Sequence, residues 1–233
     1  MTPLAETIAW LGDPSHWQGA GGIPVRLGEH LVLATVSLLI ALAIALPVGL
    51  WIGHTRRGAT LAINAANVGR ALPTLAVIGI VLPLTAALDP QLGFKVYPTL
   101  IAMVILAVPL ILVNTYAGVA GVDAELVEAA RGMGMDPRQV LWRVEMPVAL
   151  PVIAGGVRSA AVLIVATATI GAIFGSGGLG RFLVEGIAQN DDGMIFGGAV
   201  LVAGLAVLTE VVFGAIQRRL TSPGLRLAEA GQG

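Results

Sequence analysis

The chain has 233 residues, 56% of them hydrophobic and only 12% charged, and its formal net charge is −1. This composition excludes an ordinary soluble domain and indicates a protein that lies in a lipid bilayer. The small net charge argues against a nucleic-acid partner, because phosphate binding needs a concentrated basic face. The absence of cysteine excludes disulfides, thiolate catalysis and cysteine-ligated metal sites.

Residues 1–29 differ from the rest of the N-terminal half because they contain Trp10, Trp17 and a glycine-rich run, with no basic residue before Arg26. They lack the basic start and the small-residue cleavage site of a signal peptide. We therefore expect an extracytoplasmic segment that lies at the membrane interface and is anchored by its tryptophans.

Five hydrophobic stretches come next, each near the length of roughly 20 residues that crosses the hydrocarbon core. They cover residues 31–53, 71–88, part of 96–122, about 151–173 and about 193–216. The second is short and contains Pro73 and Pro83, so neighbouring helices or water must satisfy its freed backbone groups. The pattern predicts an all-α bundle of about five transmembrane helices, with one membrane domain over 30–217 and a cytoplasmic tail over 218–233.

The most polar stretch is 123–147, DAELVEAARGMGMDPRQVLWRVEMP. It predicts two short helices joined at a glycine. Asp123 is placed to cap the first helix, and Gly134 fits the position after its C-cap. Asp136 and Gln139 resemble a capping box that starts the second helix, and prolines 147 and 151 are expected to stop or kink the chain beyond it. Small residues beside Glu128 and Arg131 would let another backbone approach closely.

The order of residues in this stretch resembles the EAA motif of the membrane subunits of bacterial ABC importers, E-A-A-x3-G-x9-I-x-L-P. Only Val144 and Met146 depart from it, and both are conservative. In that family the motif is a cytoplasmic coupling helix that docks in a groove of the ATPase subunit. The resemblance assigns this docking role to Glu128, Ala129, Ala130, Arg131, Gly132, Gly134 and Pro147.

Further segments resemble the osmoprotectant branch of these permeases, which moves glycine betaine, choline, carnitine or proline betaine. They are Arg70-Ala-Leu-Pro-Thr-Leu75, Asn114-Thr-Tyr116 and Gly177-Gly-Leu-Gly180. Methionine-importer permeases share the EAA and GGLG elements and are the alternative, together with other amino-acid importers. The substrate-binding residues are not indicated by any of these segments.

The resemblance implies a type-I importer fold in the bacterial inner membrane. It also implies two ATPase subunits, a second permease that is identical or homologous, and an external solute-binding protein. No phosphate-binding loop G-x-x-x-x-G-K-[ST] occurs, so ATP and Mg²⁺ are expected on the ATPase and this chain is expected to catalyse nothing. About 29 residues precede the first span and about 17 come after the last, so no fused solute-binding domain is expected.

Arginine and lysine predict the orientation of the chain. If 123–147 is cytoplasmic, only Arg26, Lys95 and Arg181 lie outside, which obeys the positive-inside rule. The N-terminus is then outside and the C-terminus inside. The basic residues predicted to lie inside are Arg56, Arg57, Arg70, Arg131, Arg138, Arg143, Arg158, Arg218, Arg219 and Arg226.

A carboxylate inside the last span, Glu210, is costly in lipid unless it is paired or hydrated. We expect a pair with Arg158 or the tail arginines. The alternative is an ion-coupled secondary transporter, although that class often shows an internal repeat, which this sequence lacks. A non-transporting assembly factor would leave the EAA spacing unexplained.

Some weaker patterns receive structural interpretations. Residues 175–180 match G-x-G-x-x-G but come after a membrane span, so they predict a tight outer turn rather than a nucleotide site. Three G-x-x-x-G pairs, at 49/53, 171/175 and 193/197, predict close helix packing. The scattered histidines, His16, His30 and His54, offer no metal cluster and are expected in loops or at the interface.

Overall fold

The computed structural model describes residues 2–221, without the side chains of residues 3, 61, 65 and 70. Most of the predicted tail, with Arg226, and the side chain of Arg70 therefore lie outside the described residues. Within the described range the chain is helical and contains no strand, which confirms the all-α prediction.

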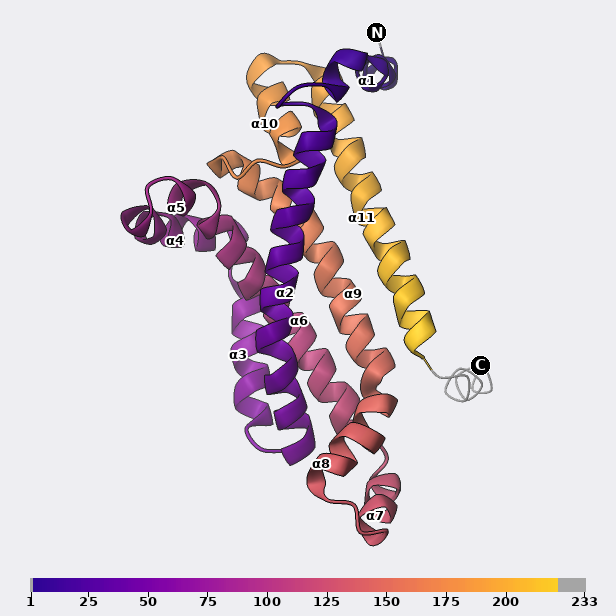
Figure 1. The fold of residues 1–233 in the computed structure, drawn as a ribbon. Coiled ribbons are helices and arrows are strands. Elements are labelled where there is room, and N and C mark those ends of the chain that lie inside the picture. Colours follow the sequence, from indigo (N-terminus) through magenta and orange to yellow (C-terminus); the bar gives the residue numbers. More distant parts are fainter. Residues whose placement is uncertain (1, 222–233) are drawn as a thin grey trace.

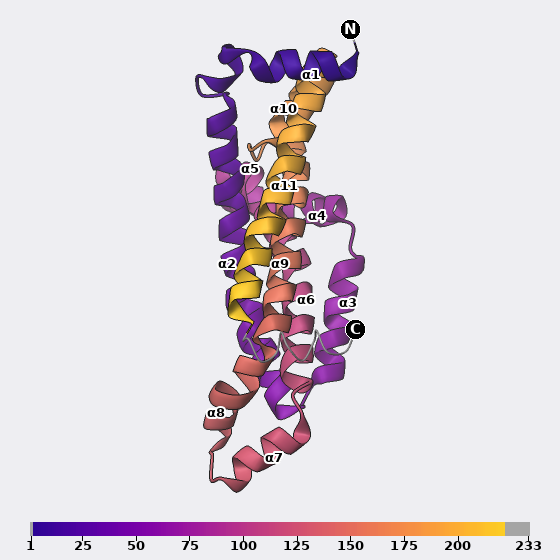
Figure 2. The same cartoon turned by 90° about the vertical axis from the view of Figure 1, so that its right-hand side faces the viewer.

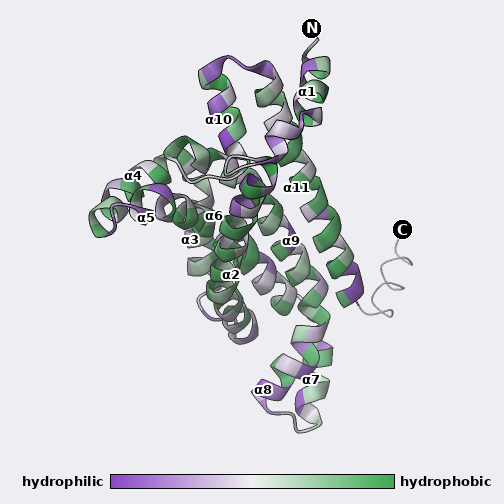
Figure 3. Ribbon diagram, turned by 45° about the horizontal axis from the view of Figure 1, so that its top comes forward, coloured by the Kyte–Doolittle hydropathy of each residue, from purple (hydrophilic) through white to green (hydrophobic). Residues whose placement is uncertain are grey.

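Four long helices run side by side in an elongated bundle (Figure 1). They are α2 (Ile23–Thr55), α6 (Tyr97–Ala120), α9 (Met146–Gly171) and α11 (Asp192–Leu220). Each lies in a stretch that is long and apolar enough to cross a membrane. Hydrophobic residues cover these helices, whereas hydrophilic ones concentrate at the two ends (Figure 3).

The predicted second span is broken. Helix α3 (Ala59–Ala71) and helix α4 (Thr74–Leu88) meet at an angle of 91°, so the described residues contain four spans, or five if this pair crosses once. Leu72, between the two helices, has an extended backbone with ψ 125°. A residue before proline is driven away from helical geometry, so Pro73 explains the break. The predicted break at Pro73 is confirmed, whereas Pro83 lies inside α4 and does not break it.

Glycines on α2 bring it close to α6. A Cβ on Gly49 would lie 2.7 Å from Thr115 Cβ, and one on Gly53 would lie 2.7 Å from Val119 Cβ. No side chain fits at either position, so the two helices can pack only because these residues are glycines. This confirms the packing prediction for the 49/53 pair and fixes the position of the end of α2.

The N-terminal residues form helix α1 (Pro3–Gly12), which lies across one end of the bundle (Figure 2), and a short 3₁₀ turn at Pro14–Trp17. Trp17 is about half exposed, but Trp10 is buried against α11, where a Cβ on Gly197 would lie 2.3 Å from its ring. The prediction that both tryptophans anchor the membrane interface is therefore wrong for Trp10.

Helix α2 begins eight residues before the predicted start of the first span, at Ile23. Arg26 and Glu29 form an ion pair one turn apart within this extension, at 3.0 Å, which supports the helix. It also places His30 inside the helix, 1% exposed, with Nε2 3.0 Å from the carbonyl oxygen of Val165. The prediction of a loop or interfacial position for His30 is wrong.

The glycine-rich segment after α9 is a tight turn, as predicted. Gly175, Gly177 and Gly178 all have positive φ, between 77° and 84°. This conformation suits glycine, and at Gly175 it ends the short 3₁₀ helix (Ala172–Phe174) that follows α9. The turn leads into α10 (Gly180–Gln189), a helix that the sequence did not reveal, and both lie far from the polar stretch 123–147 (Figure 1).

Candidate functional site: the polar end of the bundle

The polar stretch begins with α7 (Ala124–Gly132), and the predicted capping residues lie at both of its ends. The Asp123 side chain accepts a hydrogen bond from the backbone N–H of Glu125, at 2.9 Å. Gly134 has φ 83° and its N–H donates to the Arg131 carbonyl, so it ends the helix in a left-handed conformation. Both local predictions are confirmed.

The second predicted helix starts as expected but does not remain short. Asp136 and Gln139 form the reciprocal capping box at the start of α8 (Pro137–Val140). The chain then passes through a π-turn at Leu141–Glu145 directly into α9. Pro147 lies directly after the π-turn within this continuous helical run, and Pro151 lies inside α9. Of the two predicted effects, stopping the chain is wrong, because α8 continues through the π-turn into a transmembrane helix.

Most of the residues assigned to docking are accessible. Exposed side chains or backbones belong to Glu128, Ala129, Arg131, Gly132, Gly134 and Pro147. Ala130 differs, because only 2% of it is exposed. A Cβ on Gly132 or Gly134 would meet nothing within 4 Å, so space for a partner lies over this face.

Three large apolar side chains also lie exposed at this end: Leu126 (46%), Met133 (73%) and Trp142 (58%). Exposed apolar groups of this size within a polar segment are typical of a protein contact surface. The sequence analysis missed them, although apolar letters inside the most charged stretch of the chain were a usable signal.

A buried contact between a histidine and a glutamate joins this end to α2. Glu145 is 4% exposed, and its Oε2 lies 2.5 Å from His54 Nδ1 at the end of α2. A polar cavity of about 210 Å³ adjoins the pair. Its lining consists of His54, Arg56, Val122, Ala124, Val127, Glu128, Arg131 and Glu145. Groups from α2, α7 and the π-turn thus share one electrostatic environment.

The predicted charge pair within the bundle is present. Arg158 on α9 donates to Glu210 on α11, and its other terminal nitrogen donates to Gln217 Oε1 at 3.2 Å. Gln217 in turn donates to the carbonyl oxygen of Pro151, at 3.0 Å. A Cβ on Gly214 would lie 3.3 Å from the guanidinium carbon, so glycine makes room for it. Glu210 is therefore engaged by a cation rather than free.

Residues 45–226 match the family model described as the inner membrane component of binding-protein-dependent transport systems. The match runs from the second half of α2 through α11 and includes the polar stretch.

Curated relatives align over nearly their whole length. The chain is 35% identical to the carnitine transport permease protein OpuCB of Listeria monocytogenes, over 89% of this chain and 92% of the relative. It is 32% identical to the glycine betaine/carnitine/choline transport system permease protein OpuCB of Bacillus subtilis, over 88% and 92%. It is 34% identical to the osmoprotectant import permease protein OsmW of Salmonella typhimurium, over 95% and 100%.

Among solved structures, the chain resembles the MetNI methionine ABC transporter in an inward-facing conformation, with a TM-score of 0.77. The alignment covers 91% of this chain and 100% of that chain at 24% identity. At this identity the likeness concerns the fold alone, and it agrees with the predicted type-I importer architecture.

Proposed function

The chain belongs to the family of inner membrane components of binding-protein-dependent transport systems, and on that premise we propose that it imports quaternary-amine osmoprotectants. It is the permease of an ABC importer in the inner membrane. The candidate solutes are glycine betaine, carnitine, choline and proline betaine. The observation that carries this proposal is the identity of 32–35% to relatives named for such solutes, over nearly their whole length.

The proposed partners are inferred from the polar end. We place α7 and the π-turn on the cytoplasmic side, where Glu128, Ala129 and Met133 would enter a groove of the ATPase subunit. Two permeases, identical or homologous, and two ATPases would form the assembly, with ATP and Mg²⁺ on the ATPases and the binding protein outside. This chain would have no catalytic residue of its own. The support is the exposure of these side chains and the open space over Gly132 and Gly134.

The route from docking to transport would pass through α9. Because α8, the π-turn and α9 are continuous, movement of the docked ATPases would be transmitted directly to a transmembrane helix. His54 and Glu145 would carry the same movement to α2. Transport would then be a rigid-body change between two packings of the bundle.

Two rivals remain testable. Methionine import has the fold likeness to MetNI in its favour, but curated relatives at higher identity are named for osmoprotectants. Ion-coupled transport through Glu210 needs a carboxylate that can release its ion, whereas Glu210 is held by Arg158.

The test is solute uptake by the complete assembly, reconstituted in vesicles with its ATPase and binding protein. Radiolabelled glycine betaine, carnitine and choline are compared with methionine, with ATP inside the vesicles and with a non-hydrolysable analogue as the control. ATP-dependent uptake of at least one quaternary amine supports the proposal. Uptake of methionine alone, or uptake driven by an ion gradient without ATP, would contradict it.

A further inference from the structure

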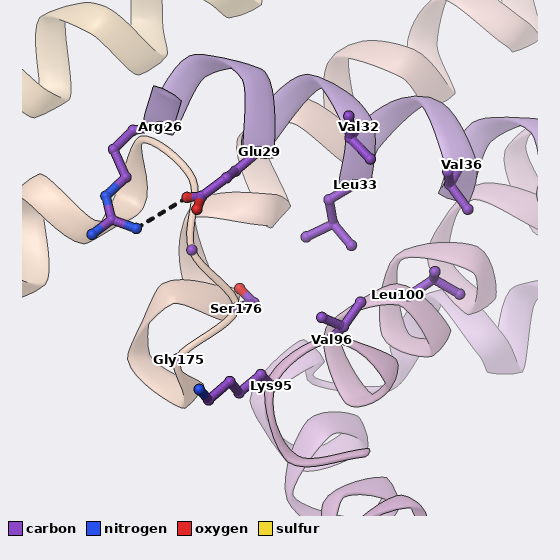
Figure 4. A pocket seen from close by; sticks show the side chains of 11 residues that line it. Arg26, Glu29, Val32, Leu33, Val36, Lys95, Val96, Leu100, Gly175 and Ser176 are labelled. Atoms are coloured by element: carbon purple, nitrogen blue, oxygen red, sulfur yellow. Dashed lines mark hydrogen bonds and ion pairs between the residues drawn. The ribbon is translucent and has the colours of Figure 1, made fainter. Parts of the chain in front are cut away.

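A cavity of about 650 Å³ lies near the end of the bundle opposite α7, between the first turns of α2, the junction of α5 (Leu92–Lys95) with α6, and the glycine turn (Figure 4). Its volume is in the range of small-molecule sites, roughly 300–1,000 Å³. The residues that line it are Arg26, Glu29, Val32, Leu33, Val36, Lys95, Val96, Leu100, Gly175, Ser176 and Gly177.

The acidic group of the cavity is already balanced. Glu29 Oε2 accepts hydrogen bonds from Arg26, at 3.0 Å, and from the backbone N–H of Gly178, at 2.9 Å. Arg26 also approaches Glu185 of α10 at 4.0 Å, and Glu185 pairs with Arg181. These two arginines and two glutamates form a network of zero net charge.

Lys95 is different, because it forms no hydrogen bond or ion pair with any other residue that the structure describes. Its stem passes beside Gly175, with Cγ 3.9 Å from the position that a Cβ there would take. Figure 4 shows Lys95 on the opposite side of the glycine turn from the Arg26–Glu29 pair. The cavity therefore carries one uncompensated positive charge, which favours an anionic group in its occupant.

Most of the remaining wall is aliphatic, apart from Ser176 and its neighbouring glycines. Val32, Leu33 and Val36 project from α2 towards Val96 and Leu100 at the start of α6 (Figure 4). These five aliphatic side chains offer no hydrogen-bonding groups, and they suit methyl groups rather than a bare ammonium, which would lose its hydration there. A cation next to an aliphatic wall matches a solute with a carboxylate at one end and methylated nitrogen at the other.

We propose that this cavity is a solute site of the permease and that it selects carboxylate-bearing quaternary amines of the betaine type. Lys95 binds the carboxylate and the aliphatic wall accepts the methylated nitrogen. The inference rests on the proposed function and narrows it, because choline has the same trimethylammonium group without a carboxylate. A cavity far from the ATPase-docking end is also where a solute delivered from outside would first enter the bundle.

The absence of cysteine allows a direct test on the purified permease–ATPase complex without its binding protein. Val32→Cys places a reporter on the cavity wall, and Gln91→Cys places a matched reporter outside it, close to Lys95. Glycine betaine should slow the reaction of a small, charged thiol reagent at position 32 but not at position 91. The concentration that halves the reaction rate measures the affinity of the site.

Lys95→Met in the Val32→Cys background should raise this half-protecting concentration for glycine betaine at least about tenfold, because a charge-assisted hydrogen bond is lost. Lys95→Arg keeps the positive charge and should leave the half-protecting concentration for glycine betaine close to that of the chain with Lys95. The half-protecting concentration for choline should not rise in Lys95→Met, because choline has no carboxylate for Lys95 to bind and the removed charge repels its cation.

Several results would overturn the inference: an unreactive Val32→Cys, equal or no protection of the two reporters, or an unchanged value for glycine betaine in Lys95→Met. Any of these, with normal uptake of quaternary amines by the unmodified assembly, would refute this site alone. An unmodified assembly that transports no quaternary amine would refute the proposed function and this inference with it.

Discussion

His54 Nδ1 lies 2.5 Å from Glu145 Oε2, so two residues that are 91 positions apart join the end of α2 to the π-turn before α9. The Glu145 side chain is 5% exposed and the His54 side chain 15%. A carboxylate that is so little hydrated needs its partner. Single π-turns within helices are frequent at functional sites, and this one ends at Glu145 itself.

Removing one member of this pair should cost more than removing both. His54→Ala leaves the buried Glu145 without a partner and should destabilise the permease by about 3 kcal/mol. Glu145→Leu combined with His54→Ala should recover most of the loss, because no uncompensated buried charge is left. Thermal unfolding of the purified permease gives the comparison. Equal destabilisation by the single and double variants would show that the two residues act independently.

The same double variant tests coupling. If the pair carries movement from the docked ATPase to α2, the double variant should fold and bind the ATPase but show a lower transport rate per ATP hydrolysed. The stoichiometry of uptake to hydrolysis in vesicles measures this. A well-folded double variant with the ratio of the unmodified assembly would assign the pair to stability alone.

Glu210 is expected to be structural. Glu210→Gln removes the charge that holds Arg158, so a lone guanidinium remains between α9 and α11 and the amount of protein in the membrane should fall. Arg158→Gln together with Glu210→Gln should restore the amount, since neither charge is then left alone. Immunoblots of membranes and the pH profile of uptake are the measurements. Normal abundance with an altered pH profile in Glu210→Gln would favour ion coupling instead.

Local signals in the sequence predicted local structure well. Asp123, Asp136 and Gly134 act as caps because their partners lie within a few residues, and long apolar runs identified α2, α6 and α11. Proline was harder to interpret, because its effect depends on its place in the turn. Pro73 lies at the break between two helices, whereas Pro147 lies within a continuous helical run, directly after the π-turn.

Features that depend on distant contacts were not predictable from one sequence. The buried His30 lies 3.0 Å from a carbonyl oxygen 135 residues away, and Ala130 is 2% exposed although it lies in the most polar stretch of the chain. The cavity around Lys95 requires α2, α6 and the glycine turn to meet. Hydropathy and residue spacing do not predict such contacts between distant segments.

The orientation is testable in intact cells with an impermeant thiol reagent. Leu92 and Gln189 are exposed and lie towards the predicted outer side, and Arg138 is exposed at the polar end. Each is replaced by cysteine in turn. We expect the first two to react and the third to react only after the membrane is permeabilised. Permeabilised cells provide the control that all three thiols are accessible. Reaction of Arg138→Cys in intact cells would reverse the orientation and remove the basis for docking at α7.

Two neighbouring glycines separate backbone strain from contact with the partner. Gly134 has a positive φ of 83°, whereas the φ of Gly132 is not positive. A Cβ added at either position would lie more than 4 Å from the other atoms of this chain, apart from its close neighbours in sequence. Gly134→Ala should therefore destabilise the turn by about 1–2 kcal/mol, whereas Gly132→Ala should leave the isolated permease unchanged or slightly more stable. Thermal unfolding of the permease without its ATPase is the measurement. Equal effects of the two substitutions would contradict the role of the left-handed conformation.

The neighbours Ala129 and Ala130 separate docking from folding. Ala129 is exposed on α7 and Ala130 is 2% exposed, so an added carboxylate meets solvent at one position and the packed turn at the other. Ala129→Asp should insert in the membrane in normal amounts, because its charge stays hydrated, but it should lose the ATPase on purification and abolish uptake of a quaternary amine. Ala130→Asp should lower the amount of folded permease itself, since burying an unpaired charge is strongly unfavourable.

Ala129→Ser, which is small and neutral, is the matched control for Ala129→Asp and should keep both the ATPase and uptake. Co-purification and quantification of the two subunits, with membrane abundance measured in parallel, distinguish the variants. Loss of the ATPase in Ala129→Asp, with its retention in Ala129→Ser, would show that the exposed face of α7 binds the ATPase. If Ala129→Asp retains the ATPase and full uptake, α7 is an ordinary solvated loop helix and the docking role must be assigned elsewhere on the chain.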